Sequence, residues 1–284
     1  MRFIALVLLI HLGLSSCSAP NKKRADGWML KDANQSVERA IKEFNRESFE
    51  RAENELYLAL RSYILLDNMQ GQVSAYLNLG SLYLMQSRLE NALPMFKKAL
   101  DISVELNNRH LSIEALSSLA GLYLLTGELS KAREAISKGL DLSKGTRLKR
   151  RKASLLNHLG NLKIKEGDYI GAEKVLLESL SLNENIDNLE GKSANYFNLG
   201  LVKLATGKYR ETHTYFKKVL TLDKQMEKPG LIARDLEKLG DVSEITAQRQ
   251  EALSYYKRSM QIYQQLKSNE DLERLSKKIK DIRE

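Results

Sequence analysis

The chain repeats itself with a period of about 40 residues, and this periodicity limits the possible fold more than any other feature. Five segments align without a gap, beginning at residues 76, 116, 156, 196 and 236. The first of them reads YLNLGSLYLMQSRLENALPMFKKAL. A period of about 20 to 50 residues is typical of repeat arrays, in which each unit buries its apolar face against its neighbours.

Four columns of this alignment indicate a pair of packed helices in each copy. A large residue is followed by a small one that allows close approach, and a second small and large pair comes later in the copy. The columns are Leu79, Leu119, Leu159, Leu199 and Leu239; Gly80, Ala120, Gly160, Gly200 and Gly240; Ala92, Ala132, Ala172, Thr212 and Ala252; and Phe96, Ile136, Leu176, Phe216 and Tyr256. Gly127, Gly167 and Gly207 fall between the two expected helices, where a helix-ending glycine is favoured.

These columns resemble the tetratricopeptide repeat, whose pattern includes Leu-Gly, a Tyr, an Ala and a large residue. The usual unit of about 34 residues is lengthened here to 40. Lys163 and Lys203 depart from the pattern, because they replace the Tyr. The resemblance implies an all-α fold, a right-handed superhelical solenoid of antiparallel helix hairpins.

Both ends of the array are predicted to be atypical. A sixth, weaker copy precedes the five, since Ala52 and Leu56 stand one period before Ala92 and Phe96. At the other end one apolar stripe on a charged helix predicts a capping helix, formed by Leu272, Leu275, Ile279 and Ile282. The expected solenoid of about six repeats and a cap therefore covers residues 31–284.

The segment LGLSSC, residues 12–17, contains the only cysteine of the chain. A lone cysteine excludes an intramolecular disulfide and a thiolate-cluster metal site. The apolar run from Ile4 to Leu14 follows Arg2 and has the length of a signal peptide rather than of a membrane span. Residues 14–17, LSSC, resemble a bacterial lipobox, which implies removal of residues 1–16 and lipidation of Cys17. An ordinary secretory signal and a buried apolar N-terminus are the alternatives.

Residues 17–30 are then expected to be the lipidated cysteine and a tether to the solenoid. Trp28 is either an interfacial anchor or a lid on the first helix. Ser18 fits sorting to the outer membrane by resemblance, so we expect a lipid-anchored protein of the cell envelope, facing the periplasm. The net charge of +9, from which loss of residues 1–16 subtracts only Arg2, favours anionic surfaces.

No motif in the sequence predicts catalysis, a cofactor or a metal ion. The four histidines, among them His158, have no paired-ligand spacing, and neither a P-loop nor a GxGxxG occurs. The carboxylates alternate with Lys, as is typical of solvated helix faces. We therefore expect a binding protein and not an enzyme.

One face of each first helix is expected to be exposed. At about 100° per residue, Asn78 and Ser81 share a sector opposite the packed Gly80 and Tyr83. In the resembling family this sector lines a concave groove that takes an extended peptide. The predicted partner-binding residues are Asn78, Ser81, Ser118, His158, Asn161, Asn198 and Lys238. Amides both donate and accept hydrogen bonds, so Asn78 and Asn198 are candidate clamps, or merely tolerated exposed residues.

The run SKGTRLKRRKASLL places six bases within nine residues and contains no acid. The bases, here called the basic patch, are Lys144, Arg147, Lys149, Arg150, Arg151 and Lys152. Anionic lipid headgroups or an acidic partner would suit the patch, whereas nucleic acid is disfavoured because no aromatic residues alternate with the bases. A solvated charge run beside a helix is the alternative.

These patterns predict a membrane-anchored scaffold that binds a protein or extended peptide and assists assembly of a bacterial envelope complex. A self-associating structural lipoprotein without a peptide ligand is one alternative. If the lipobox is misread, a cytoplasmic peptide-sensing regulator is another.

Overall fold

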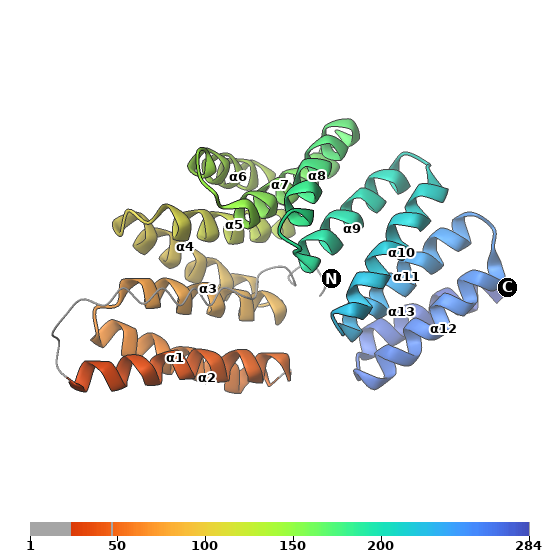
Figure 1. The fold of residues 1–284 in the computed structure, drawn as a ribbon. Coiled ribbons are helices and arrows are strands. Elements are labelled where there is room, and N and C mark those ends of the chain that lie inside the picture. The colour runs from red at the N-terminus through yellow and green to blue at the C-terminus, as the bar shows by residue number, and fades with distance from the viewer. Residues whose placement is uncertain (1–23, 47, 284) are drawn as a thin grey trace. The chain divides into compact units, whose positions relative to one another are not determined.

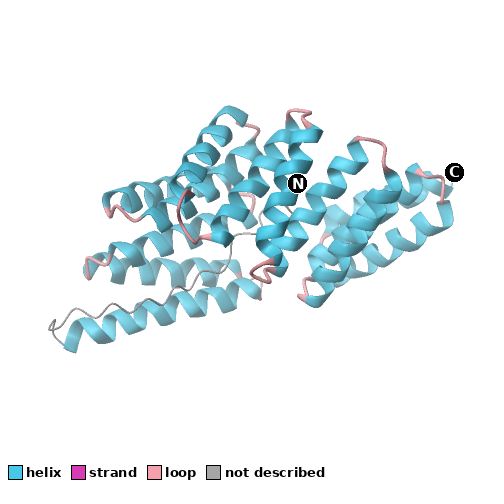
Figure 2. Ribbon diagram, turned by 45° about the horizontal axis from the view of Figure 1, so that its top comes forward, coloured by secondary structure: helices cyan, strands magenta, loops and turns pink. Residues whose placement is uncertain are grey.

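In the computed structural model, residues 24–46 and 48–283 are described, and they form thirteen α-helices without a strand (Figures 1 and 2). The helices are α1 Arg24–Asn45, α2 Phe49–Leu65, α3 Met69–Met85, α4 Leu89–Glu105, α5 Arg109–Thr126, α6 Leu129–Ser143, α7 Lys149–Lys165, α8 Tyr169–Glu184, α9 Leu189–Ala205, α10 Tyr209–Gln225, α11 Pro229–Ile245, α12 Arg249–Gln265 and α13 Asn269–Arg283. The chain divides after Arg151 into two compact units.

The close approach of paired helices depends on glycine at the predicted column. A Cβ at Gly80 would lie 2.4 Å from the ring of Phe96 on the next helix, and one at Gly240 would lie 2.4 Å from the ring of Tyr256. Phe96 and Tyr256 are fully buried. The ring therefore occupies the space that a side chain at the glycine would need. Consecutive helices pack in pairs along the chain, which confirms the predicted all-α solenoid of helix hairpins.

The turns between helices recur at half the repeat period with one geometry. Their shared feature is a residue with positive φ: Asp67, Ser87, Asn107, Gly127, Gly167, Asp187, Gly207, Glu227, Ala247 and Lys267. In the turn after α3, the amide of Arg88 donates to the carbonyl of Tyr83 at 2.9 Å, which is the bond of a Schellman cap. Turns within hairpins and turns between hairpins therefore use the same cap, and the helix-ending role of Gly127, Gly167 and Gly207 is confirmed.

The connection between α6 and α7 departs from this pattern. It spans residues 144–148, and its positive φ falls at Gly145, out of step with the series of the other turns. Arg109 donates to the carbonyl of Leu142 at 2.8 Å and so satisfies an acceptor near the end of α6. The basic patch coincides with this irregular connection.

The two ends of the described chain are both helical. Residues 24–30, assigned from the sequence to the tether, form the start of α1, and Trp28 is 61% exposed there rather than packed as a lid. At the other end, the apolar stripe of α13 is buried at Leu275, Ile279 and Ile282. Cys17 and the expected signal peptide lie outside the described residues. Among the described helices, none has both the length and the apolar character needed to cross a membrane.

Candidate interaction surfaces

Asn78 on α3 and Asn161 on α7 are the predicted site residues whose amides remain available. Both side chains are partly exposed, and no described residue forms a hydrogen bond with either amide. The two residues belong to different units, so each marks the first-helix face of its own unit. A free amide on a helix can bond both the N–H and the C=O of an extended peptide.

Ser81 and Ser118 occupy the same expected face but are not accessible. They are 3% and 1% exposed. Each hydroxyl bonds within its own helix, Ser81 to the carbonyl of Leu77 at 2.9 Å and Ser118 to that of Glu114 at 3.1 Å. A short hydroxyl readily satisfies itself on the carbonyl four residues back, and neighbouring side chains then cover it. These two serines therefore cannot contact a partner in this structure.

Asn198 is committed to a buried amide network in the second unit. Its amide donates to Asn157 Oδ1 at 3.0 Å, and Asn195 donates to the same oxygen at 3.0 Å. The network continues as Asn183 donates to Asn195 at 2.7 Å and Asn188 donates to Asn183 at 2.7 Å. Since Asn198 is 6% exposed, its amide joins α9 to α7 and is not available as a clamp.

The remaining predicted partner-binding residues, His158 and Lys238, do not offer a free positive charge either. Burial lowers the pKa of His158 to about 4, so its imidazole is uncharged at neutral pH. Lys238 donates to Asp241 at 3.0 Å. Toward α11 the first-helix face of the second unit thus presents an ion pair rather than a free cation.

Three bases of the basic patch form ion pairs, each with an acid of its own unit. Lys144 pairs with Asp141 at 2.7 Å, Arg151 with Glu114 at 2.9 Å, and Lys152 with Glu178 at 2.8 Å. Four of the patch bases begin α7, where the helix dipole disfavours positive charge, and the glutamates offset that cost. Arg147 and Lys149 are exposed, and no described residue forms an ion pair with them.

The MalT-like tetratricopeptide-repeat region is the family model that matches the sequence, over residues 34–236. The chain belongs to this tetratricopeptide-repeat family. A search of curated proteins finds no match.

Solved structures with the same repeat fold span most of this chain. A Rap protein complexed with competence and sporulation factor has a TM-score of 0.65 and 15% identity, covering 89% of this chain and 75% of its own. BtubC from P. vanneervenii has a TM-score of 0.58 and 19% identity, covering 87% and 94%. PilW, a type IV pilus biogenesis factor, has a TM-score of 0.56 and 20% identity, covering 86% and 97%. At these identities the likeness shows the fold alone.

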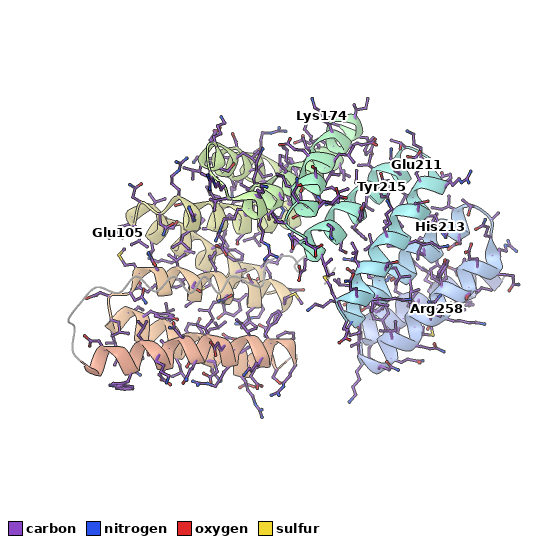
Figure 3. All side chains as sticks on the ribbon, viewed as in Figure 1. Glu105, Lys174, Glu211, His213, Tyr215 and Arg258 are labelled. Atoms are coloured by element: carbon purple, nitrogen blue, oxygen red, sulfur yellow. The ribbon has the colours of Figure 1, made fainter. Side chains whose placement is uncertain are left out.

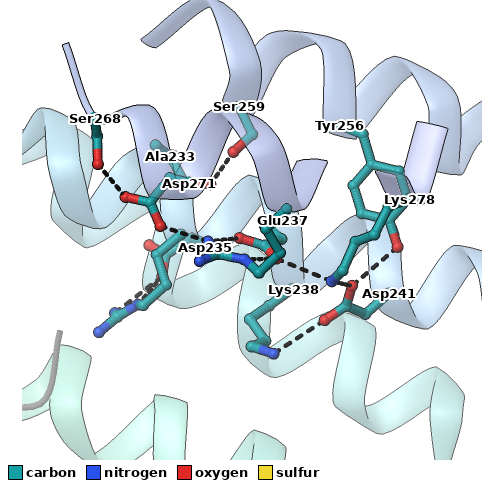
Figure 4. A network of polar contacts seen from close by, with 12 residues as sticks. Ala233, Asp235, Glu237, Lys238, Asp241, Tyr256, Ser259, Ser268, Asp271 and Lys278 are labelled. Atoms are coloured by element: carbon teal, nitrogen blue, oxygen red, sulfur yellow. Dashed lines mark hydrogen bonds and ion pairs between the residues drawn. The ribbon is translucent and has the colours of Figure 1, made fainter. Parts of the chain in front are cut away.

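The last tetratricopeptide hairpin carries a charged network that the sequence reasoning missed (Figure 4). Glu237 on α11 accepts two hydrogen bonds from Arg274 on α13, at 3.0 and 2.7 Å, and lies 2.9 Å from Lys278 Nζ. Burial alone would raise the pKa of Glu237, but the bonds from Arg274 and Lys278 lower it below its usual value. Lys278 also pairs with Asp241, which accepts from Tyr256 at 2.9 Å. The network fastens α13 to the preceding hairpin.

A pair of buried acids, Asp223 on α10 and Asp235 on α11, lies where these two helices pack. Asp223 is 0% and Asp235 1% exposed, and Arg234 contacts Asp235 at 3.0 Å. Burial raises the pKa of Asp235 to about 8; Arg234 opposes this and Asp223 adds to it. Asp223 and Asp235 stand one repeat period after Asn183 and Asn195. The available signal was the column of Asn195 and Asp235, which holds Ala75, Ala115 and Leu155 in the preceding repeats.

The first hairpin has an open cavity of about 420 Å³ between α1 and α2. Its lining is mixed in charge: Arg39, Lys42, Glu43, Arg46, Arg51, Asn54 and Glu55. Arg39 pairs with Glu55 at 3.0 Å, which uses part of this charge internally. Among residues 24–46 and 48–283, no three side chains of His, Cys, Asp or Glu gather as a metal ion requires.

Proposed function

We propose that this chain is a lipid-anchored scaffold of the bacterial envelope that binds a protein or an extended peptide along its first-helix faces. The observation that carries the proposal is the pair of partly exposed amides, Asn78 and Asn161, which no described residue engages. Membership in the tetratricopeptide-repeat family supports a protein-interaction role. The Rap protein, which was solved in complex with competence and sporulation factor, and PilW, a type IV pilus biogenesis factor, support a peptide or protein partner.

The envelope location rests on the sequence. Residues 14–17 support lipidation of Cys17, and two or more acyl chains hold a protein stably at a bilayer. Outer-membrane sorting toward the periplasm is part of the proposal, on the strength of Ser18. Mass spectrometry of the mature chain tests the anchor: the native N-terminal peptide should carry acyl chains on Cys17, and an unmodified peptide there would refute the anchor.

Partner binding is tested by cross-linking the full-length chain in cells and comparing it with Asn78→Ala/Asn161→Ala. Removing both amides should abolish capture of the principal partner while leaving the far-ultraviolet circular dichroism unchanged. The matched control is Lys97→Ala/Lys257→Ala, one exposed second-helix residue from each unit, which should capture as the parent does. Equal capture by the parent and the amide variant would remove the first-helix faces from the function.

Self-association without a peptide ligand is the second candidate, favoured by exposed apolar side chains on the first hairpin. Mass measured over a range of concentrations separates the two functions. A scaffold that binds its partner through Asn78 and Asn161 can remain monomeric when alone, whereas the molar mass of a self-associating protein must rise with its concentration.

A further inference from the structure

The outer side of α2 carries a row of exposed large apolar residues. Tyr57, Leu58, Ile64 and Leu65 are between 44% and 64% exposed, and the hydroxyl of Tyr57 shares a hydrogen bond with that of Tyr83 on α3 at 2.9 Å. They repeat at a spacing of seven residues and therefore share one side of the helix, opposite the buried Leu56 and Tyr63 side. Arg61 lies between them, exposed, and no described residue forms an ion pair with it.

The same positions in the other repeats are mostly charged or polar. In α4 they are Lys97, Lys98, Val104 and Glu105; in α10, Lys217, Lys218, Lys224 and Gln225; in α12, Lys257, Arg258, Gln264 and Gln265. Figure 3 labels Glu105 on α4 and Arg258 on α12. These positions therefore carry mainly polar side chains in α4, α10 and α12, and the apolar row of α2 is a local departure from the pattern.

Two more exposed apolar side chains lie at the end of the first hairpin where α1 begins. Tyr63 donates to Asn34 Oδ1 at 2.7 Å, which fixes the register of the antiparallel helices α1 and α2. Ile64 and Leu65 follow Tyr63, while Trp28 and Leu30 precede Asn34, so all four lie at the same end. We call Trp28, Leu30, Tyr57, Leu58, Ile64 and Leu65 the entry surface.

The sequence just before the entry surface indicates what covers it. Lys22, Lys23 and Arg24 are three consecutive bases four to six residues ahead of Trp28, and the single acid between them and Trp28 is Asp26. Cys17 precedes Arg24 by seven residues, and a chain of that length reaches at most about 25 Å. An acylated Cys17 would therefore hold the start of α1 within that distance of a bilayer, and tryptophan and basic residues favour its interface.

We propose that the entry surface docks on an anionic lipid bilayer, with Trp28 and the α2 row entering the interface and Arg61 reaching the headgroups. The inference rests on the proposed lipid anchor for the nearness of the bilayer. Apolar contacts and neighbouring bases together are the combination that binds an anionic interface. A second copy of the chain would cover the apolar row but would give no role to the run of bases at Lys22, Lys23 and Arg24.

The experiment uses the chain from Ser18 onward, which keeps every described residue and carries no lipid. Trp28 is the only tryptophan, so its fluorescence reports the entry surface alone. With vesicles of phosphatidylethanolamine and phosphatidylglycerol, its emission should shift to shorter wavelength and the protein should sediment with the lipid. With phosphatidylcholine vesicles, or at high salt, the fraction bound should fall because the basic contribution is lost or screened.

The deciding variant is Leu58→Lys/Leu65→Glu, which gives α2 the residues that α4 already carries at these positions. It should fold as the parent does, and its affinity for anionic vesicles should be lower by a factor of about ten or more. The matched control is Leu177→Lys on α8, an exposed leucine of the second unit at the position equivalent to Tyr57, which should bind as the parent does.

Equal vesicle binding by the parent and the Leu58→Lys/Leu65→Glu variant would overturn the inference. The inference would also be overturned if the molar mass of the parent rose with concentration while the variant stayed monomeric, since the occupant of the entry surface would then be a second copy. Acyl mass at Cys17 is measured separately on the native protein. Loss of the lipid anchor and loss of the entry surface are therefore distinguished.

Discussion

The first hairpin and the last three helices end the described chain in opposite ways. At the C-terminal end, α13 buries its apolar stripe against α12 and ties itself to α11 through Glu237, Arg274 and Lys278. At the N-terminal end, α2 leaves a row of large apolar side chains exposed. The terminal unit of a repeat array needs a polar outer face to stay soluble. The C-terminal end meets that need within the chain, whereas the N-terminal end meets it only if another surface covers it.

The sharpest test of this contrast is Glu237→Ala. Removing a carboxylate that is 7% exposed leaves Arg274 and Lys278 without their common partner, and a half-broken buried pair is strongly destabilising. Because both cations are partly exposed, we expect the free energy of unfolding to fall by about 2 to 3 kcal/mol. Thermal unfolding followed by circular dichroism measures the loss, and limited proteolysis should release α13 first.

The matched change at the other end is Arg39→Ala, which breaks the pair with Glu55 in the first hairpin. Arg39 is 45% exposed, so the expected loss is below about 1 kcal/mol. If Glu237→Ala and Arg39→Ala lowered the free energy of unfolding equally, the charged network would not stabilise the C-terminal end more than the ion pair stabilises the N-terminal end.

The next effect in size is the pH dependence that Asp235 on α11 gives to the free energy of unfolding. An unfolded Asp235 loses its proton near its ordinary pKa of about 4, but the folded chain keeps the proton until about pH 8. Stability from this group is therefore fully present at low pH and is lost as pH rises toward 8. His158 acts in reverse, because its pKa is lowered from 6.5 to about 4 and it removes stability as pH falls below 6.5.

In the window from pH 6.5 to 8 the contribution of Asp235 dominates, because the opposite contributions of His158 and of His213, whose pKa burial also lowers, act mainly below pH 6.5. Over it the unfolding free energy should fall by at most about 2 kcal/mol, and Asp235→Asn should flatten the curve. Thermal midpoints measured across this window check the change. An unchanged slope in the Asn variant would show that Asp235 ionises in the folded chain as it does in the unfolded one.

Periodicity predicted the hairpins, the glycine column and the capping helix, because each depends on residue size at a fixed spacing. It did not predict which polar residues of the first-helix face stay available. Ser118 and Asn198 have the same helical phase as Asn78, but their surroundings bury them, and burial depends on neighbouring helices. The network at Glu237 joins residues 37 positions apart, so its existence depends on packing that a single repeat cannot reveal.

The smallest effect concerns the one feature that the two ends share, the turn cap with positive φ. Ser87 in the first unit has a φ of 58° and Ala247 in the second a φ of 59°, where their glycine counterpart Gly207 has 73°. A side chain in this region is strained, and both residues are exposed, so no packing is lost on removing it. Ser87→Gly and Ala247→Gly should each stabilise the protein by about 0.5 to 1 kcal/mol, measured by thermal unfolding. Gly207→Ala should destabilise by a similar amount. Because the backbone cap is the same in both units, unequal gains at Ser87 and Ala247 would mean that the units differ in their turns as well as in their exposed faces.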